Sequence, residues 1–225
     1  MALEMVPFDI ETTGFDVTDE VTVVGLEVSL GCRVFLQADA DTLDGDVAAL
    51  EATVSERCGT HVKLSVHASE AALLEAVGAF ASERLHGEDV LLVAFNGERW
   101  KDGFDLPFLR TRLAATDVAW PFRDMPYADL LPVVTRRFNL TVDGEAQSTL
   151  PAAYEVLVDG DLNDRDPFAE SGAAVAAFAE ARHAALVTHN VVDVLRTGAV
   201  GQVTRRYCSK SDYSLKSLTS TIHDT

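Results

Sequence analysis

The sequence predicts an α/β fold in which helices flank a mixed β-sheet. Three β-prone runs follow one another at short spacing near the N-terminus, and residues 89–96 form a continuous apolar run, typical of a strand buried on both faces. Between residues 68 and 85, apolar side chains recur at helical spacing. The chain has 225 residues, 48% of them hydrophobic, which suits a single domain over 1–225 with a sizeable core. We expect this core to span about 5–200, followed by a C-terminal extension over 201–225.

The N-terminal part is predicted to form an antiparallel meander. Three strands are expected at residues 5–12, 21–30 and 33–37. The connections between them are short, and Gly31 marks the second. The aspartate-rich stretch 39–46 is predicted to be a loop, and residues 47–58 to be a helix.

The later elements alternate between helix and strand. The helix over 68–85 has Ser69 in position to cap its N-terminus. Strands at 89–96 and 125–130 complete a sheet of five strands. Further helices are predicted at 106–115, 132–138, 149–157 and over most of 168–207, with a break near 186–188.

The composition is strongly acidic. The chain has 36 acidic and 18 basic residues, a formal charge of −18, and only four of the basic residues are lysine. This profile resembles that of proteins from salt-loving archaea. Such a charge disfavours a broad electrostatic grip on nucleic acid unless the medium is salty, because molar salt shortens the Debye length to roughly 3 Å.

Cysteine usage and hydropathy point to a cytoplasmic protein. Cys32, Cys58 and Cys208 are far apart and lack the spacing of a zinc site or a disulfide framework, so a reducing compartment is expected. Neither a signal peptide nor an apolar stretch long enough to span a membrane is expected.

Asp9 and Glu11 form the most informative pair of residues. Because a strand alternates faces, the two carboxylates share one face of the first strand, opposite Phe8 and Ile10. Such a pair repels, and burial adds a desolvation cost, unless a proton or a cation lies between the two groups. A hard divalent cation fits oxygen ligands best. The alternative is a pair of exposed acids on an edge strand.

Asp105 is the second acidic candidate. It follows Asn96-Gly97 at the end of the predicted strand 89–96, and ligand sites in open α/β sheets gather at the carboxyl ends of strands. It also immediately precedes a predicted helix, so a purely structural role as N-cap is the alternative.

The third candidate is the pair His189 and Asp193. Their i, i+4 spacing places both side chains on one face of a helix. A histidine beside a carboxylate can act as a general base near neutral pH. The alternative is a surface pair in which Asp193 neighbours Arg196.

These acids, in this order, resemble the four carboxylates of the DEDD superfamily of 3′→5′ exonucleases. Phe8–Gly14 (Phe-Asp-Ile-Glu-Thr-Thr-Gly) is similar to the first motif of that family. Asn96-Gly97 with Phe104–Leu109 (Phe-Asp-Leu-Pro-Phe-Leu) resembles the second, in the form found in the proofreading domains of family B DNA polymerases. His189–Thr197 resembles the third. The resemblance implies a ribonuclease-H-like fold, whose five-stranded sheet combines an antiparallel meander with parallel strands.

The resemblance also implies an activity, namely hydrolysis of phosphodiester bonds at single-stranded DNA or RNA 3′ ends with two Mg²⁺ or Mn²⁺ ions. It implies that His189 takes a proton from the attacking water. The implied metal ligands are Asp9, Glu11, Asp105 and Asp193, and the implied substrate contacts are Asn96, the backbone amides of Thr12 and Thr13, and the ring of Phe15.

Two departures from the family pattern leave alternatives open. Glu98–Gly103 looks like an insertion. The spacing between His189 and Asp193 is typical of the tyrosine subclass, so the histidine is either the base or a substitute that orients water. A non-catalytic nucleic-acid-binding module and a structure-specific endonuclease are the other functions that this fold would allow. The sequence does not indicate the oligomeric state.

Overall fold

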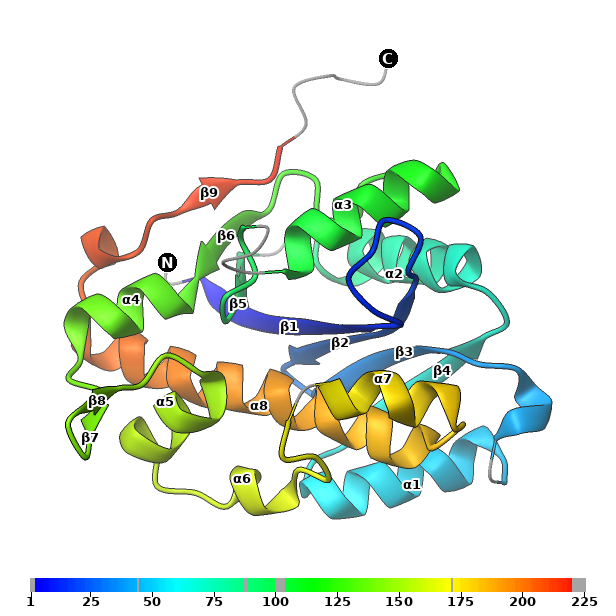
Figure 1. The fold of residues 1–225 in the computed structure, drawn as a ribbon. Helices are drawn as coiled ribbons and strands as arrows, with labels where there is room; N and C mark the ends of the chain where they lie inside the picture. Colours follow the sequence, from blue (N-terminus) through cyan, green and yellow to red (C-terminus); the bar gives the residue numbers. More distant parts are fainter. Residues whose placement is uncertain (1–2, 44, 87–88, 100–103, 171, 220–225) are drawn as a thin grey trace.

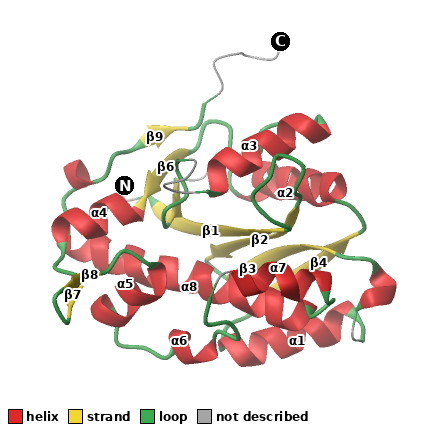
Figure 2. Cartoon of the chain, viewed as in Figure 1, coloured by secondary structure: helices red, strands yellow, loops and turns green. Residues whose placement is uncertain are grey.

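The structure is a computed structural model that describes residues 3–43, 45–86, 89–99, 104–170 and 172–219. It is an α/β fold with a seven-stranded mixed sheet between two layers of helices (Figures 1 and 2). The strand order is β4-β3-β2-β1-β5-β6-β9. The predicted α/β class is therefore confirmed.

The centre of the sheet follows the prediction. β1 (Glu4–Thr12), β2 (Val21–Val28) and β3 (Gly31–Gln37) form an antiparallel meander. β5 (Val90–Ala94) pairs in parallel with β1, and β6 (Pro126–Asp129) pairs in parallel with β5. β1 therefore lies in the middle of the sheet, and its carboxyl end opens towards the loops that follow β5 and β6.

The predicted number of five strands is wrong, because two more strands extend the sheet. β4 (Val62–His67) pairs in parallel with β3, and its alternating Val62, Leu64 and Val66 are a strand signal that the prediction missed. β9 (Lys216–Ser217), within the predicted C-terminal extension, pairs with the outer side of β6.

Side chains of the preceding helix cover the outer edge of β4. α1 (Val47–Cys58) places Ser55 and Glu51 beside this strand. The backbone N–H of Val62 donates to Ser55 Oγ at 3.1 Å, and that of Leu64 donates to Glu51 Oε2 at 2.9 Å. These two amides are thereby satisfied without a further strand.

The helices lie on both faces of the sheet (Figure 1). α2 (Glu70–Arg84) and α3 (Asp105–Thr116) cover one face, and Ser69 caps α2 as predicted by accepting from Ala72 N. The opposite layer is built around the 25-residue α8 (His183–Tyr207). No helix in the described ranges is long and apolar enough to span a membrane. The remaining helices are α4 (Leu130–Arg137), α5 (Leu150–Leu157), α6 (Leu162–Arg165) and α7 (Gly172–Ala179), with short 3₁₀ turns at Ala40–Thr42 and Lys210–Asp212 and a small hairpin of β7 (Thr141–Val142) and β8 (Glu145–Ala146).

The predicted break near residues 186–188 is also wrong. α8 runs through this segment, where Leu186 and Val187 are fully buried and no glycine or proline interrupts the helix. The chain instead turns between α7 and α8, where Ala181 adopts a left-handed φ of 54°. The helical region starts at 172 rather than 168.

Alternation along β1 separates apolar from acidic side chains. Phe8 and Ile10 belong to the core beneath α2 and α3. Val23 of β2 belongs to a second core on the other face, with residues of α1, α7 and α8. Asp9 and Glu11 point away from Phe8 and Ile10, towards α8, as the period of two predicts. The strand thus delivers two carboxylates to the α8 layer.

Glu27 of β2 is a further acid beneath α8. Its carboxyl lies so close to Gly198 that a Cβ at that glycine would overlap Oε2. Burial raises the pKa of Glu27 from 4.5 to about 7. Since the folded protein holds this proton more tightly than the unfolded chain does, the resulting stabilisation is complete below about pH 4.5 and is lost as the pH rises through 7.

We therefore expect Glu27→Gln to raise the free energy of unfolding above pH 7 by about 2 kcal/mol relative to the wild type. Below about pH 4 the difference should nearly vanish, because the glutamate is then mostly neutral in both states. Urea denaturation at pH 4 and pH 8, followed by circular dichroism, measures this effect. Glu83→Gln on the exposed side of α2 controls for the change in net charge. Equal stabilisation by Glu27→Gln at both pH values would contradict the assignment.

Candidate functional site

Asp9 is fixed by a side chain from α8. Asn190 Nδ2 donates to Asp9 Oδ2 at 2.9 Å and to the Asp9 carbonyl at 3.2 Å. Asn190 is completely buried against Gly25, the residue of β2 that pairs with Asp9. A Cβ at Gly25 would overlap Asn190 Oδ1, so only glycine allows this close approach of helix and strand.

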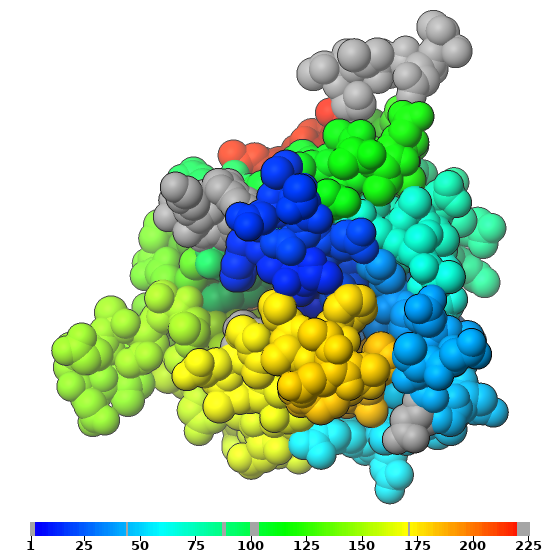
Figure 3. Space-filling view, turned by 45° about the vertical axis from the view of Figure 1, so that its right-hand side comes forward, coloured from blue at the N-terminus to red at the C-terminus, as the bar shows by residue number. Residues whose placement is uncertain are grey.

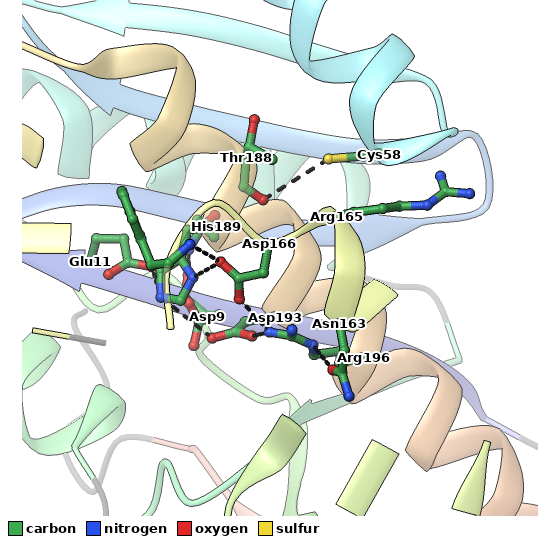
Figure 4. A network of polar contacts seen from close by, with 12 residues as sticks. Asp9, Glu11, Cys58, Asn163, Arg165, Asp166, Thr188, His189, Asp193 and Arg196 are labelled. Carbon is green, nitrogen blue, oxygen red and sulfur yellow. Dashed lines mark hydrogen bonds and ion pairs between the residues drawn. The ribbon is translucent and has the colours of Figure 1, made fainter. Parts of the chain in front are cut away.

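His189 and Asp193 face the same acids, one turn apart on α8 (Figure 4). His189 Nε2 lies 3.9 Å from Glu11 Oε1 and 3.8 Å from Asp193 Oδ2. The predicted sharing of one helical face is therefore present in the structure. These separations exceed a hydrogen bond but lie within direct electrostatic reach.

A buried ion network supports both residues from behind (Figure 4). Asp166, in the segment between α6 and α7, accepts from His189 Nδ1 at 2.8 Å through Oδ1 and from Arg196 at 2.6 Å through Oδ2. Arg196 is 2% exposed and also donates to Asp193 Oδ1 at 2.6 Å. Asn163 Oδ1 accepts from Arg196 Nε at 2.9 Å. The surface alternative for Asp193 is thus right about its partner Arg196, but Arg196 is buried and Asp193 is half-buried.

Asp105 reaches the site from the start of α3. It is 6% exposed, and Phe104 rather than Asp105 occupies the N-cap position, so the alternative of a structural cap is wrong. The backbone amides of Phe104 and Leu106 donate to the carbonyls of Asn96 and Gly97. A Cβ at Gly97 would lie 2.5 Å from Asp105 Oδ2, so the glycine leaves room for this carboxyl.

Asp129 fixes the turn that holds Asp105. Its Oδ1 accepts from the backbone N–H groups of Asn96 and Leu131, and its Oδ2 accepts from that of Glu98. Asn96 adopts a left-handed φ of 65° in this turn. Within the predicted insertion, residues 100–103 lie outside the described residues.

Burial and mutual repulsion raise the pKa values of the acids. Burial raises the pKa of Asp9 well above its usual range, and the charges of Glu11, Asp105 and Asp193 raise it further, against the Asn190 hydrogen bond. The pKa of Asp105 is also raised, first by burial and then by the charges of Asp129, Glu11 and Asp193. The four predicted acids are therefore brought into mutual electrostatic range.

The pKa values of Glu11 and Asp193, the two acids that face His189 Nε2, are raised as well. Burial raises the pKa of Glu11 to about 8, although the charge of His189 opposes this. Burial raises the pKa of Asp193 as well, against the charges of His189 and Arg196. Burial opposes protonation of His189, but the Asp166 hydrogen bond and the charges of Glu11 and Asp193 outweigh it, so its pKa rises to about 9. Without a bound cation, protons and the imidazolium balance this cluster.

Of the four predicted substrate contacts, Thr12, Thr13 and Phe15 lie at the end of β1 and in the loop that follows it, whereas Asn96 lies in the turn after β5. Figure 3 shows this loop at the surface, beside α3 and the α7 segment. Phe15 is 67% exposed and packs edge-on against Phe104, with ring centroids 5.1 Å apart. Its ring also lines a hollow of about 350 Å³ with Pro107 and Thr111.

The threonines are engaged within the loop itself. Thr12 Oγ1 donates to the Gly14 carbonyl, and Thr13 Oγ1 donates to Asp19 Oδ1. The backbone N–H of Thr13 donates to the Glu20 carbonyl at 2.9 Å. The predicted contact of this amide with a nucleotide would therefore require the loop to open.

Sequence reasoning missed Asp166 and Asn190. Asp166 lies 23 residues before His189, outside any periodic pattern, so no local signal marked it. Asn190 stands inside the third motif, but on a helix it follows His189 by one residue and so belongs to a different face. In comparisons with known proteins, no protein-family model and no curated protein matches this sequence.

Proposed function

We propose that this protein is a metal-dependent 3′→5′ exonuclease that hydrolyses phosphodiester bonds at single-stranded ends of DNA or RNA. The observation that carries the proposal is the convergence of Asp9, Glu11, Asp105 and Asp193 from three separate elements, with mutually raised pKa values. Asp193 is paired with Arg196, but Asp9 and Asp105 have no cationic partner in the described part of the chain to offset their burial.

A ribonuclease-H-like arrangement of the sheet is part of this proposal. The antiparallel β1–β2–β3 unit, followed by parallel β5 and β6, supports it. β4 and β9 are then additions at the two sides of a five-stranded centre.

The donor set fits Mg²⁺ or Mn²⁺, because both ions prefer carboxylate oxygens and offset the repulsion that raises these pKa values. Asp9, Glu11, Asp105 and Asp193 would hold two such ions. When bound, ions of this kind activate water and stabilise the leaving oxygen of a phosphodiester.

The surrounding residues set the positions of these ligands. Asn190 fixes Asp9, and Arg196 holds Asp193 by one oxygen, leaving Oδ2 directed at the site. The ring of Phe15, exposed beside α3, is suited to stacking on a terminal base. A site built on one exposed ring and buried acids favours a single strand, whose bases are free to stack, over a duplex.

The experiment is a nuclease assay on 5′-labelled DNA and RNA oligonucleotides, with Mg²⁺ or Mn²⁺, at low and at molar KCl. We expect products that shorten stepwise from the 3′ end, protection by a blocked 3′ terminus, and complete inhibition by a chelator. A circular single strand should stay intact.

Two results would overturn the proposal. Cleavage of the circle would indicate an endonuclease. Binding of oligonucleotides that survives chelation, with no degradation under any of these conditions, would indicate a non-catalytic binding module.

A further inference from the structure

Only one ring nitrogen of His189 faces the acids. Nδ1 lies 2.8 Å from Asp166 Oδ1, and because a carboxylate only accepts hydrogen bonds, Nδ1 carries the proton. In the neutral ring the lone pair is then on Nε2. This atom points towards Glu11 and Asp193 (Figure 4).

Nε2 has no hydrogen-bond partner in the described part of the chain, although the His189 side chain is only 6% exposed. Asp193 likewise has one atom that is hydrogen-bonded and one that faces the site. Its Oδ1 is bound by Arg196, whereas its Oδ2 is the oxygen that faces Nε2. Nε2 and Asp193 Oδ2 thus face each other, and Nε2 also faces Glu11 Oε1.

The separations of Glu11 and Asp193 from Nε2 are each short enough for a shared cation. Bonds of about 2.0–2.2 Å from nitrogen or oxygen to a transition metal limit two ligand atoms of one ion to about 4.3 Å apart. Nε2 lies 3.8 Å from Asp193 Oδ2 and 3.9 Å from Glu11 Oε1, inside that limit. Both separations are too long for a direct hydrogen bond.

Asp166 has a supporting role rather than a ligand role. One of its oxygens lies within 4.8 Å of donor atoms of His189 and Asp193. However, its Oδ1 accepts from His189 Nδ1 and from the Phe168 amide, and its Oδ2 accepts from Arg196. A carboxylate behind the distal nitrogen of a histidine is the usual outer partner of a metal-bound imidazole.

We propose that His189 Nε2 binds a divalent transition-metal ion together with Glu11 and Asp193, and that Asp166 orients the imidazole for this bond. The inference rests on the metal site of the proposed function and changes the role of His189 from proton acceptor to ligand. Mg²⁺ takes oxygen ligands almost exclusively, whereas Mn²⁺ accepts an imidazole nitrogen beside carboxylate oxygens. The site should therefore bind Mn²⁺ more tightly than Mg²⁺.

The test measures metal binding without nucleic acid. Titration of Mn²⁺, followed by the electron paramagnetic resonance signal of the free ion, gives the affinity, and Mg²⁺ competition gives the preference. Pulsed spectra of the bound Mn²⁺ report ¹⁴N coupling from a directly bound imidazole. We expect this coupling in the wild type and its loss in His189→Gln.

Substitutions at His189 and Asp166 distinguish a metal-binding histidine from one that only accepts a proton. His189→Gln and Asp166→Asn should each weaken Mn²⁺ binding by about 10- to 100-fold and leave Mg²⁺ binding within a few-fold. His183→Gln, which alters another buried histidine of α8 away from the acids, should leave Mn²⁺ affinity and the ¹⁴N coupling unchanged. A wild-type spectrum without ¹⁴N coupling, or full Mn²⁺ affinity in folded His189→Gln, would overturn the proposal.

This outcome is distinguishable from failure of the proposed function. Mn²⁺ bound with ¹⁴N coupling, but no degradation of oligonucleotides, would remove the exonuclease and keep the histidine ligand. Degradation of oligonucleotides by a protein whose bound Mn²⁺ shows no ¹⁴N coupling would keep the exonuclease and remove the histidine ligand.

Discussion

Asp9→Asn should lower the kcat/KM of the proposed exonuclease by at least about 1,000-fold. The substitution removes a central charge from the proposed ion-binding cluster, and ions of this kind stabilise the transition state by several kcal/mol. The fold should survive the change. The amide oxygen of the new asparagine can accept the same hydrogen bond from Asn190 Nδ2, and the substitution removes a charge that burial already disfavours. Hydrolysis of a labelled oligonucleotide and thermal unfolding measure the two effects.

The metal dependence of stability gives an independent readout of the same change. Mn²⁺ should raise the unfolding temperature of the wild type, since an ion that binds only the folded state stabilises it by mass action. The shift should largely disappear in Asp9→Asn. Asp164→Asn, on the exposed side of α6, should keep both the activity and the shift. Activity of Asp9→Asn within tenfold of the wild type would rule out this carboxylate as a metal ligand.

Gly25→Ala should destabilise the protein by about 2–3 kcal/mol. Its new methyl group would overlap Asn190 Oδ1 and lie 3.1 Å from Val194 Cγ2, so α8 would have to move away from β2. Alanine normally improves on glycine inside a regular element, and therefore the sign of the effect is decided by the steric overlap. Activity should fall as well, because Asn190 holds the Asp9 carboxylate.

Gly78→Ala in α2 is the matched control. No atom lies within 4 Å of its new Cβ, so this substitution should stabilise the helix by up to about 1 kcal/mol. Urea denaturation followed by circular dichroism compares the two variants with the wild type. Stability of Gly25→Ala equal to that of Gly78→Ala would show that the contact between α8 and β2 is not tight.

Local periodicity explains what could be predicted about the site. The alternation of β1 places Asp9 and Glu11 opposite Phe8, and the i, i+4 spacing places His189 and Asp193 together on α8. Both are properties of a single element, so a short stretch of sequence determines them.

Contacts between distant segments explain what could not be predicted. Asp166 becomes a partner of His189 only because the segment before α7 folds back onto α8, and Arg196 is buried by that same return. The strand β4 was missed, although Val62, Leu64 and Val66 alternate, because this signal is only six residues long and lies between two helices. Its identity as a strand depends on pairing with β3.

The two edges of the sheet, at β4 and at β9, have a consequence for solubility. Ser55 and Glu51 already bind the outward amides of Val62 and Leu64, and β9 covers part of the outer side of β6. Within the described ranges, neither margin therefore presents a long row of unpaired backbone groups as a template for another chain. In concentrated brine, where charge no longer keeps molecules apart, this blocking of strand addition protects against aggregation when repulsion cannot.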